Sequence, residues 1–539
     1  MKNTFDGCTI IDVFEKTCKK YASKPAFSCM GRTLSFADVD RLSAKFAVYL
    51  QTQTNLQPGD RIAMQMPNIL QYPVTLFGAL RAGMIVVNTN PLYSARELKH
   101  QLCDSGAKML VVLANVSQAA AEIIAGTQVE QVVVTQIGDL HRPLKRLLIN
   151  YLVDHIKKLV PHVCFPNRIE FANIMAQPSS VFSAVTVAVD DVAVLQYTGG
   201  TTGIAKGAML SHQNLVANMQ QVRYHLANAF QEGRDYFVAP LPLYHIYAFT
   251  IHCMCTFSLG SHSLLIPNPR DIKGFVAALK GKKITGFMGL NTLFNALCYD
   301  RDFQRLDFSH LRLTCSGGMA LTTDTADLWR ETTGCNICEG YGLTETSPVL
   351  CINPFSAIKL GTVGTPLCDT EIKLVSVTGD DIKQVLGTVT EAGELCARGP
   401  QLMRGYWANE RATTQVIDPQ GWFHTGDVAK IDADGYVVIV DRLKDMIIVS
   451  GFNVYPNEIE EVVSSHPSVL EAAAIGVVDT HSGESVKLFV VKADDSLTEQ
   501  QLRGYCRKNL TAYKIPRTIV FRQQLPKTNV GKILRRELR

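Results

Sequence analysis

A loop rich in glycine and threonine is the first segment of the chain whose residue types suit chemistry. Residues 197–207 read YTGGTTGIAKG and follow the apolar run VAVLQY, so a strand should lead into the loop. Glycines permit close backbone approach and positive φ, while threonine hydroxyls and Lys206 can bind anionic oxygens. The spacing differs from the GK[ST] ending of a Walker motif. The loop therefore predicts a polyphosphate cradle, with a flexible turn that binds nothing as the alternative.

Three more motifs follow, each of which could equally be a turn or a solvated tail. Residues 340–345 read GYGLTE, and a carboxylate placed beside phosphates favours a divalent cation such as Mg²⁺. Residues 421–427 read GWFHTGD, where the Asp427 carboxylate can accept hydrogen bonds from two neighbouring hydroxyls. Lys532 lies in the basic segment LPKTNVGKILRREL.

In this order the motifs resemble those of the adenylate-forming superfamily, which comprises acyl-CoA synthetases, luciferases and peptide-synthetase adenylation domains. The similarity runs from near residue 10 to residue 539 and is greatest to the bacterial long-chain fatty acid–CoA ligases. It implies ATP-dependent conversion of a fatty acid to acyl-AMP with release of pyrophosphate. Transfer of the acyl group to CoA then gives acyl-CoA and AMP. ATP, Mg²⁺ and CoA are the implied cofactor and co-substrates.

The resemblance also assigns residues to the nucleotide. It places Tyr341 against adenine, Thr344 at the α-phosphate and Asp427 at the ribose, and it makes Thr198 and Glu345 the Mg²⁺ ligands. The full nucleotide set that it implies is Thr198, Gly199, Gly200, Thr201, Thr202, Gly203, Lys206, Gly317, Gly318, Glu339, Gly340, Tyr341, Gly342, Thr344, Asp427, Arg442 and Lys532.

Four members of that set are the implied catalytic residues: Lys532, Glu345, Thr344 and Lys206. When a carboxylate attacks the α-phosphate two anions meet, and the charge of Lys532 would stabilise the transition state. Lys444 matches the hinge about which the C-terminal domain rotates between the half-reactions. Ser450 and Gly451 match the segment that shapes the pantetheine tunnel.

The acid-binding pocket is expected in a stretch without charged side chains, residues 236–269. The stretch exceeds the ~20 residues of a membrane span, but its four prolines and three histidines favour a strand or turn leading into a buried helix. The resemblance makes His245 an acyl-site residue and Phe249 a gate, although tryptophan is a known choice at that gate. Gly289 is a secondary candidate, and ordinary core packing is the alternative for both His245 and Phe249.

The elements that must position these residues follow an α/β pattern. Helical and strand-like segments alternate through residues 1–190, which favours parallel sheets covered by helices. We predict a large N-terminal domain over residues 1–440 that includes a small β subdomain at 370–440. A hinge at 441–445 then leads into a smaller, mobile α+β C-terminal domain at 446–539.

Charge and cysteine content narrow the class of protein. A net charge of +4 on 539 residues argues against a nucleic-acid partner. Fifteen scattered cysteines with one isolated CxxC favour thiols in a reducing cytosol over a zinc ribbon. Residues 141–165 hold five Lys or Arg and one Asp, a surplus equal to the net charge of the whole chain. This segment is either a basic amphipathic helix on a membrane or an ordinary surface helix.

The family resemblance implies a cytoplasmic enzyme that associates peripherally with the inner face of the membrane, and it leaves a homodimer open. Three other functions fit parts of the sequence. A medium-chain or aryl acid–CoA ligase shares every nucleotide motif, and a fatty acyl-AMP ligase loads a carrier protein instead of CoA. A non-enzymatic lipid carrier is disfavoured by the intact Lys206, Glu345, Asp427 and Lys532.

Overall fold

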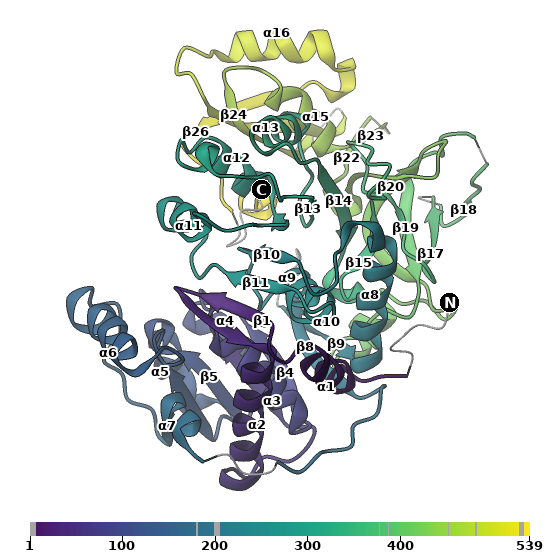
Figure 1. Ribbon diagram of the computed structural model, residues 1–539. Helices are drawn as coiled ribbons and strands as arrows, with labels where there is room; N and C mark the ends of the chain where they lie inside the picture. The colour runs from purple at the N-terminus through teal and green to yellow at the C-terminus, as the bar shows by residue number, and fades with distance from the viewer. Residues whose placement is uncertain are drawn as a thin grey trace. The chain divides into compact units, whose positions relative to one another are not determined.

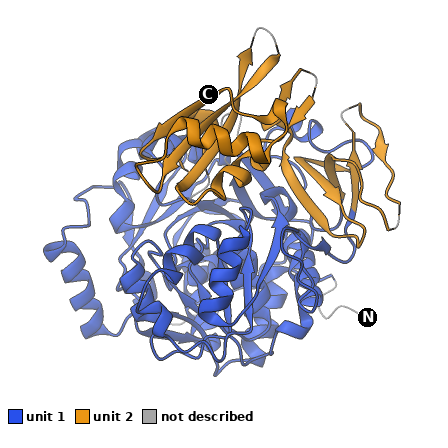
Figure 2. Ribbon diagram, turned by 90° about the horizontal axis from the view of Figure 1, so that it is seen from above, with its two compact units in different colours: residues 1–371, 398–421 blue, residues 372–397, 422–539 orange. Residues whose placement is uncertain are grey.

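The computed structural model describes residues 7–178, 182–198, 205–376, 378–385, 387–450, 452–479, 482–527 and 533–539. The chain divides into two compact units, coloured separately in Figure 2: residues 1–371 with 398–421, and residues 372–397 with 422–539. The predicted α/β class is confirmed. The predicted boundary at Asp441 falls inside the second unit, so the division at 440 stays a prediction.

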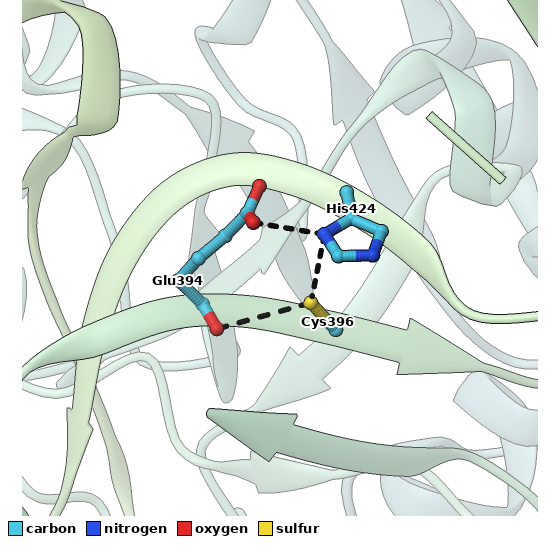
Figure 3. Close-up of side chains that lie close together, drawn as sticks. All are labelled: Glu394, Cys396 and His424. Atoms are coloured by element: carbon cyan, nitrogen blue, oxygen red, sulfur yellow. Dashed lines mark hydrogen bonds and ion pairs between the residues drawn. The ribbon is translucent and has the colours of Figure 1, made fainter. Parts of the chain in front are cut away.

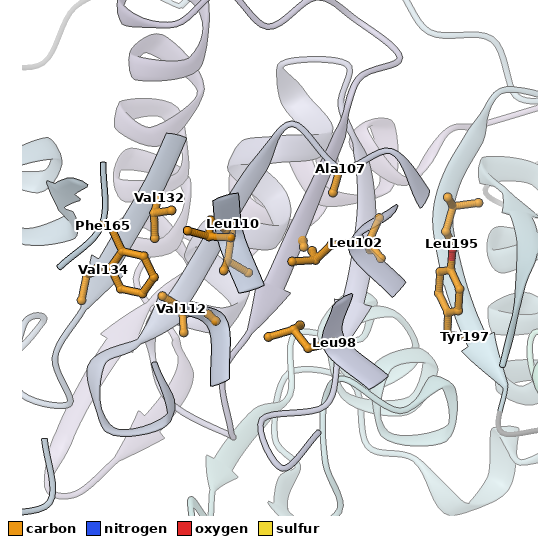
Figure 4. Close-up of a cluster of buried hydrophobic side chains, with 14 of the residues drawn as sticks. Leu98, Leu102, Ala107, Leu110, Val112, Val132, Val134, Phe165, Leu195 and Tyr197 are labelled. Atoms are coloured by element: carbon orange, nitrogen blue, oxygen red, sulfur yellow. The ribbon is translucent and has the colours of Figure 1, made fainter. Parts of the chain in front are cut away.

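The first unit contains two large sheets, and the seven-stranded one carries the glycine- and threonine-rich loop. Its order is β7(Arg168–Glu170), β6(Gln131–Thr135), β5(Met109–Leu113), β3(Arg61–Gln65), β4(Ile85–Thr89), β8(Val192–Thr198) and β9(Lys206–Ser211). All neighbours are parallel except β8 and β9. Parallel strands need crossover connections, which the helices supply. Buried apolar side chains from this sheet and the segments packed on it, among them Leu98, Leu110 and Tyr197, form the cluster drawn in Figure 4.

The second sheet of this unit has nine strands. Its order is β16(Thr365–Pro366), β15(Val349–Ile352), β14(Ile337–Gly342), β13(Leu313–Ser316), β12(Gly286–Gly289), β10(Tyr236–Ala239), β11(His262–Leu265), β1(Pro25–Cys29) and β2(Arg32–Ser35). The strands from β14 to β1 are parallel, and antiparallel pairs close both edges. Trp329 and Phe287 pack in the core beneath this sheet.

Helices surround both sheets (Figure 1). Several begin with reciprocal side-chain caps, such as Thr9 with Asp12 and Ser35 with Asp38, which satisfy the first free backbone N–H groups. The helices of this unit are α1(Ile10–Lys20), α2(Phe36–Gln53), α3(Gln71–Arg81), α4(Ala95–Ser105), α5(Gln118–Ile123), α6(Pro143–Tyr151), α7(Phe171–Ala176), α8(His212–His225), α9(Ile246–Ala248), α10(Thr256–Ser258), α11(Ile272–Leu279), α12(Asn291–Cys298), α13(Thr323–Thr333) and α14(Glu410–Thr414).

The second unit contains two five-stranded sheets. One has the order β18(Asp381–Ile382), β17(Glu371–Val375), β19(Gly393–Arg398), β20(Phe423–Ile431) and β21(Val437–Arg442). The other has β23(Phe452–Val454), β22(Ile447–Val449), β25(Gly483–Lys492) and β24(Val469–Asp479), with β26(Thr518–Arg522) beside β25. The helices of this unit are α15(Pro456–Ser464) and α16(Glu499–Asn509).

The stretch without charged side chains folds inside the first unit. After β10 it forms one helical run, in which α9 continues through a π-helical segment, Phe249–Cys255, into α10. Every residue of the π-helical segment is buried, so the predicted buried helix is confirmed. Within the described ranges no helix combines the length and apolarity needed to cross a bilayer.

The cysteines are thiols, as predicted. All fifteen lie in the described residues and none is in a disulfide, and eleven are buried. Burial raises the pKa of thiols such as Cys29 and Cys351 to about 12, so they stay protonated and unreactive at neutral pH.

Candidate functional site

The glycine- and threonine-rich loop is closed at its base by strand pairing. Thr198 ends β8 and Lys206 begins β9, and these two residues face each other in the antiparallel register. Beneath them the Tyr197 hydroxyl donates a 2.5 Å hydrogen bond to the Asp104 carboxylate. The predicted phosphate-binding residues between the strands lie outside the described residues: Gly199, Gly200, Thr201, Thr202 and Gly203.

Tyr406 connects two of the predicted catalytic residues. The Lys206 Nζ lies 4.4 Å from the centroid of the Tyr406 ring, on whose face a cation is attracted. The hydroxyl of the same ring donates a 2.7 Å hydrogen bond to Glu345 Oε1. Burial and the adjacent carboxylate raise the pKa of Tyr406, which keeps the hydroxyl a donor. Sequence reasoning missed Tyr406. It lies in the segment RGYW, within residues 398–421, where the chain belongs to the first unit again after residues 372–397 in the second.

Three parallel strands deliver the other nucleotide candidates to one edge of the nine-stranded sheet. Gly289 on β12, Ser316 on β13 and Glu339 on β14 stand at the same register level. Beyond this level β14 continues through Tyr341 and ends at Gly342. Ligands of α/β sheets bind outside the carboxyl ends of the strands. The topology therefore places the predicted adenine segment where such a sheet binds ligands.

A cavity of about 660 Å³, including its part open to solvent, lies at this edge. Seven residues predicted from the sequence line it: His245, Gly317, Gly318, Gly340, Tyr341, Gly342 and Thr344. Much of the remaining lining is apolar and was not predicted, including Leu226, Phe230, Ile251, Met288 and Val349. One cavity thus joins the predicted adenine motif to the predicted acyl-site histidine.

Two glycines have steric reasons to be glycine. A Cβ on Gly342 would lie 1.9 Å from the backbone oxygen of Pro348, which no side chain tolerates. Gly318 has a φ of +84°, a conformation that L-residues rarely adopt. Gly342 is therefore required by the space around it, and Gly318 is favoured by its backbone conformation.

Two polar atoms in the cavity wall lack hydrogen-bond partners among the described residues. They are the Tyr247 hydroxyl and the Ser316 hydroxyl, and both are buried. Unsatisfied buried hydroxyls are costly, so a polar ligand group that reached them would be stabilised. Sequence reasoning passed over Tyr247 because a tyrosine in an apolar run reads as core.

Two predicted acyl-site residues do not line this cavity. Phe249 is fully buried in the π-helical segment, and its side chain belongs to the interior. At Gly289, a Cβ would lie 2.6 Å from two carbons of the Phe294 ring, so that ring fills the space beside the glycine. The gate role of Phe249 and the acyl role of Gly289 stay predictions.

Glu339 is a buried carboxyl at the edge of the cavity region. It is 6% exposed, and its Oε1 accepts a 3.1 Å hydrogen bond from the Leu321 backbone N–H. Burial raises the pKa of Glu339 from 4.5 to about 7, against the lowering effect of that hydrogen bond. At neutral pH the Glu339 carboxyl in the folded protein is therefore close to half protonated.

The Glu339→Gln variant should gain stability relative to the parent protein as the pH rises. The unfolded chain releases this proton near pH 4.5 and the folded protein near pH 7, so the carboxyl reduces stability progressively between these values. Gln does not titrate, and the gain from pH 5 to pH 8 should be about 2.5 kcal/mol. Thermal unfolding of both proteins without ligands at each pH measures it. A pH-independent difference between them would contradict the assignment.

In the second unit, Asp427 and Arg442 form a pair across two strands. They face each other in the register of β20 and β21, and Arg442 Nε lies 2.7 Å from Asp427 Oδ1. The Asp427 side chain is 4% exposed, and Arg442 is the more exposed partner. The structure thus brings together Asp427, which the resemblance places at the ribose, and Arg442 of the same nucleotide set.

A cluster that was not predicted from the sequence supports the turn before Asp427. Figure 3 shows Glu394 and His424 pointing toward each other from neighbouring strands, with Cys396 alongside. Glu394 Oε2 lies 2.8 Å from His424 Nδ1, and Glu394 Oε1 accepts a 3.1 Å hydrogen bond from Gly426 N–H. Together these three side chains could also coordinate a metal ion. Their evident structural effect is to hold the backbone that presents Asp427.

A buried arginine organises the predicted hinge. Arg535 lies 2.7 Å from Glu460 and 3.3 Å from Asp441, and it also contacts Asp445. These anions raise the pKa of Arg535 despite its burial. Lys444 lies in the 3₁₀ helix Leu443–Asp445, between Asp441 and Asp445 in the sequence. Burial lowers the pKa of Lys444.

The remaining predicted residues follow that hinge in the sequence. Ser450 is exposed and has a φ of +51°. Gly451 and the predicted catalytic Lys532 lie outside the described residues.

Comparison with protein families decides the class. A model of the AMP-binding enzyme family matches residues 14–407, and a model of the AMP-binding enzyme C-terminal domain matches residues 458–532. The chain belongs to the AMP-binding enzyme family. The residues that line the cavity of this AMP-binding enzyme fall in the first matched range, as do Lys206, Glu345 and Tyr406. Glu460 and Lys532 fall in the second.

Relatives of this AMP-binding enzyme match almost its whole length. A long-chain-fatty-acid–CoA ligase of Escherichia coli O157:H7 is 49% identical over 98% of this chain and 94% of its own. A ligase of the same name from Haemophilus influenzae is 47% identical over the same shares. Among solved structures, ATP-bound MatB from Rhodopseudomonas palustris has a TM-score of 0.83 at 28% identity, and the match covers 98% of each chain.

Proposed function

We propose that this AMP-binding enzyme is a long-chain fatty acid–CoA ligase. It joins a fatty acid to AMP with release of pyrophosphate, and then transfers the acyl group to CoA with release of AMP. The observation that carries this proposal is 49% identity to a long-chain-fatty-acid–CoA ligase across 98% of the chain. Adenylation makes chemical sense, because a carboxylate lacks a good leaving group until AMP supplies one.

For the nucleotide, we propose that the cavity edge holds the adenosine and the loop at 199–205 holds the phosphates. Tyr341 would stack on adenine beside Gly317 and Gly318, and Thr344 would contact the α-phosphate. These four residues line one cavity, which supports the assignment. Asp427 and Arg442 would bind the ribose, as a buried carboxylate with an adjacent guanidinium suits hydroxyl groups.

Mg²⁺ would enter with ATP, and the residues present fit that ion. Glu345 is a buried carboxylate with one oxygen held by the Tyr406 hydroxyl. Its other oxygen and the Thr198 hydroxyl are the hard oxygen donors that Mg²⁺ prefers. The ion would offset the repulsion between phosphates and carboxylate, while Lys206 and Lys532 supply positive charge to the phosphate oxygens.

For the acid, we propose that the apolar part of the cavity binds the carboxyl end of the acyl chain. His245 is exposed on its wall, and Ile251 and Met288 supply apolar surface near it. Each buried methylene contributes about 0.8 kcal/mol. An apolar channel can thus favour longer chains without any polar group that recognises the far end.

For the second half-reaction, we propose that the C-terminal domain turns about Lys444 and presents the segment of Ser450 and Gly451 to CoA. Because long-chain acids partition into bilayers, we also propose that the enzyme associates peripherally with a membrane. Both proposals derive from the family resemblance and from the chemistry of the substrate.

A panel of acids from acetate to oleate tests the function. We expect CoA-dependent AMP formation to rise with chain length, with kcat/KM increasing by up to about tenfold for each two carbons until the channel is filled. A benzoate and a ferulate arm serve as aryl controls. Highest activity on these, or on octanoate, would assign the enzyme to the aryl or medium-chain ligases. Adenylate formation without CoA thioester would instead indicate a carrier-loading acyl-AMP ligase.

A further inference from the structure

Helix α6 turns its apolar stripe toward water. Its exposed side chains include Leu144, Leu147, Leu148 and Tyr151, which are between 55% and 85% exposed. With Leu152 they recur at the i, i+3, i+4, i+7, i+8 spacing of a single helix face. A helix on a globular protein normally packs such a stripe on the core. Here the stripe is the outer face, and α6 stands at the outer left edge of the first unit in Figure 1.

The opposite side of the helix shows how that orientation is held. Ile149 is the buried residue of α6. Next to it, Asn150 Oδ1 accepts a 2.9 Å hydrogen bond from Gly138 N–H, and Asn150 Nδ2 lies 3.4 Å from the Asp139 carboxylate. One aliphatic side chain and one amide thus anchor the helix. They fix the leucines outward instead of leaving the rotation of the helix free.

The apolar surface extends beyond α6. The chain continues as a π-helical segment, Leu152–Ile156, and Ile156 and Leu159 are 62% and 54% exposed. Met30, in the turn between β1 and β2, adds to it, because the Lys145 Nζ donates a 2.8 Å hydrogen bond to the Met30 backbone oxygen. We call this surface the α6 face, and it consists of Met30, Leu144, Leu147, Leu148, Tyr151, Leu152, Ile156 and Leu159. Seven of the nineteen large apolar side chains exposed in the described residues lie in the stretch 144–159.

Positive charge is concentrated in the segment that carries most of the α6 face. Its basic side chains are Arg142, Lys145, Arg146, Lys157 and Lys158, and among residues 142–159 the sequence has one acidic residue, Asp154. Asp154 lies 3.4 Å from the His155 ring. An apolar stripe in a segment with five basic residues and one acidic residue is the composition of helices that lie in the plane of an anionic membrane surface.

We infer that the α6 face docks on an anionic lipid bilayer, which deepens the peripheral membrane association proposed above and rests on it. The helical run of residues 143–156 is too short to span a bilayer, so it would lie in the interface. A second copy of the chain is the other candidate occupant. A two-fold dimer would place the same patch on both subunits, which would bring the five basic residues of each copy together. Anionic headgroups complement this charge, whereas a second copy repels it.

Vesicle flotation of the full-length enzyme tests the apolar part of the face. The triple variant Leu144→Ser, Leu147→Ser and Leu148→Ser should bind vesicles of 7:3 phosphatidylcholine and phosphatidylglycerol about 100-fold more weakly than the parent protein. The matched control is Leu92→Ser, Leu360→Ser and Leu470→Ser, three exposed leucines outside the α6 face. The control should bind within about twofold of the parent.

The charged part is tested with a second matched pair. Changing Lys145, Arg146, Lys157 and Lys158 to Gln should abolish the preference for phosphatidylglycerol over pure phosphatidylcholine. It should also remove most of the salt dependence of binding. The control changes four exposed lysines on and after α11, whose apolar side is buried: Lys273, Lys280, Lys282 and Lys283. The control should keep both the lipid preference and the salt dependence.

The outcomes separate this inference from the proposed function. Thioester formation from decanoate without lipid should be equal in all variants, and this measurement tests the ligase activity alone. A parent protein that does not bind vesicles would overturn the membrane association and the docking face together, while leaving the ligase proposal intact. Equal binding by parent and triple variant would overturn the docking face alone. Loss of a dimer in the triple variant, seen by sedimentation and without change in vesicle binding, would assign the face to a second copy.

Discussion

The Lys532→Ala variant should lose acid-dependent pyrophosphate release by a factor of about 1000 or more. The reason is electrostatic, because the attacking carboxylate and the α-phosphate are both anionic and Lys532 is the implied cation between them. Thioester formation from supplied acyl-adenylate should stay within a few-fold of the parent enzyme, since that step no longer brings two such anions together. Pyrophosphate release and thioester formation, assayed separately, measure the two effects.

Lys508→Ala is the matched control for this variant. Lys508 is an exposed lysine in the last turn of α16, in the same unit of the structure. Its substitution should leave both half-reactions unchanged. If Lys532→Ala slowed both half-reactions equally, the residue would be a general structural or binding element and its catalytic assignment would be wrong.

The Glu345→Gln variant should reduce kcat/KM for ATP by about 100-fold or more and shift the Mg²⁺ titration to higher concentration. Gln keeps the shape that the Tyr406 hydroxyl contacts but removes the negative charge that favours a divalent cation. Activity measured over a range of Mg²⁺ at saturating acid and CoA separates a change in ion affinity from a change in turnover.

Two comparisons sharpen that result. Tyr406→Phe removes one hydrogen bond to a charged group, worth about 1.5–3 kcal/mol, so it should cause a smaller loss in the same direction. Glu410→Gln, an exposed carboxylate at the start of α14, should cause none. An unchanged Mg²⁺ requirement in Glu345→Gln would rule out Glu345 as an ion ligand.

The sequence could predict sites that depend on contiguous motifs, because each such motif carries its own strand, turn and side chains. Gly340 to Glu345 is one example, since β14 and the 3₁₀ helix after it place Tyr341 and Thr344 on one cavity. Tyr406 could not be predicted in this way. Its contact with Glu345 joins residues 61 positions apart and depends on how the chain returns to the first unit after residue 397.

The orientation of α6 shows a second limit. Periodicity predicts that residues 144–152 carry an apolar stripe, but it does not predict which face of the helix packs on the rest of the protein. That is decided by the burial of Ile149 and by Asn150, whose hydrogen-bond partners Gly138 and Asp139 belong to the preceding loop. The gate role of Phe249 comes from the family resemblance alone and stays a prediction, and the structure has a fully buried ring at that position.

The pairing of Thr198 with Lys206 has a consequence for conformational entropy. The strands β8 and β9 already hold the two ends of the seven-residue connection between them, so the cost of closing that loop is met when the protein folds. A polyphosphate that bound this connection would therefore meet a loop whose two ends the strand pair already fixes. Substitutions within the connection should therefore change nucleotide affinity with little effect on the stability of the protein. Substitutions in the strand pair beneath it should affect both.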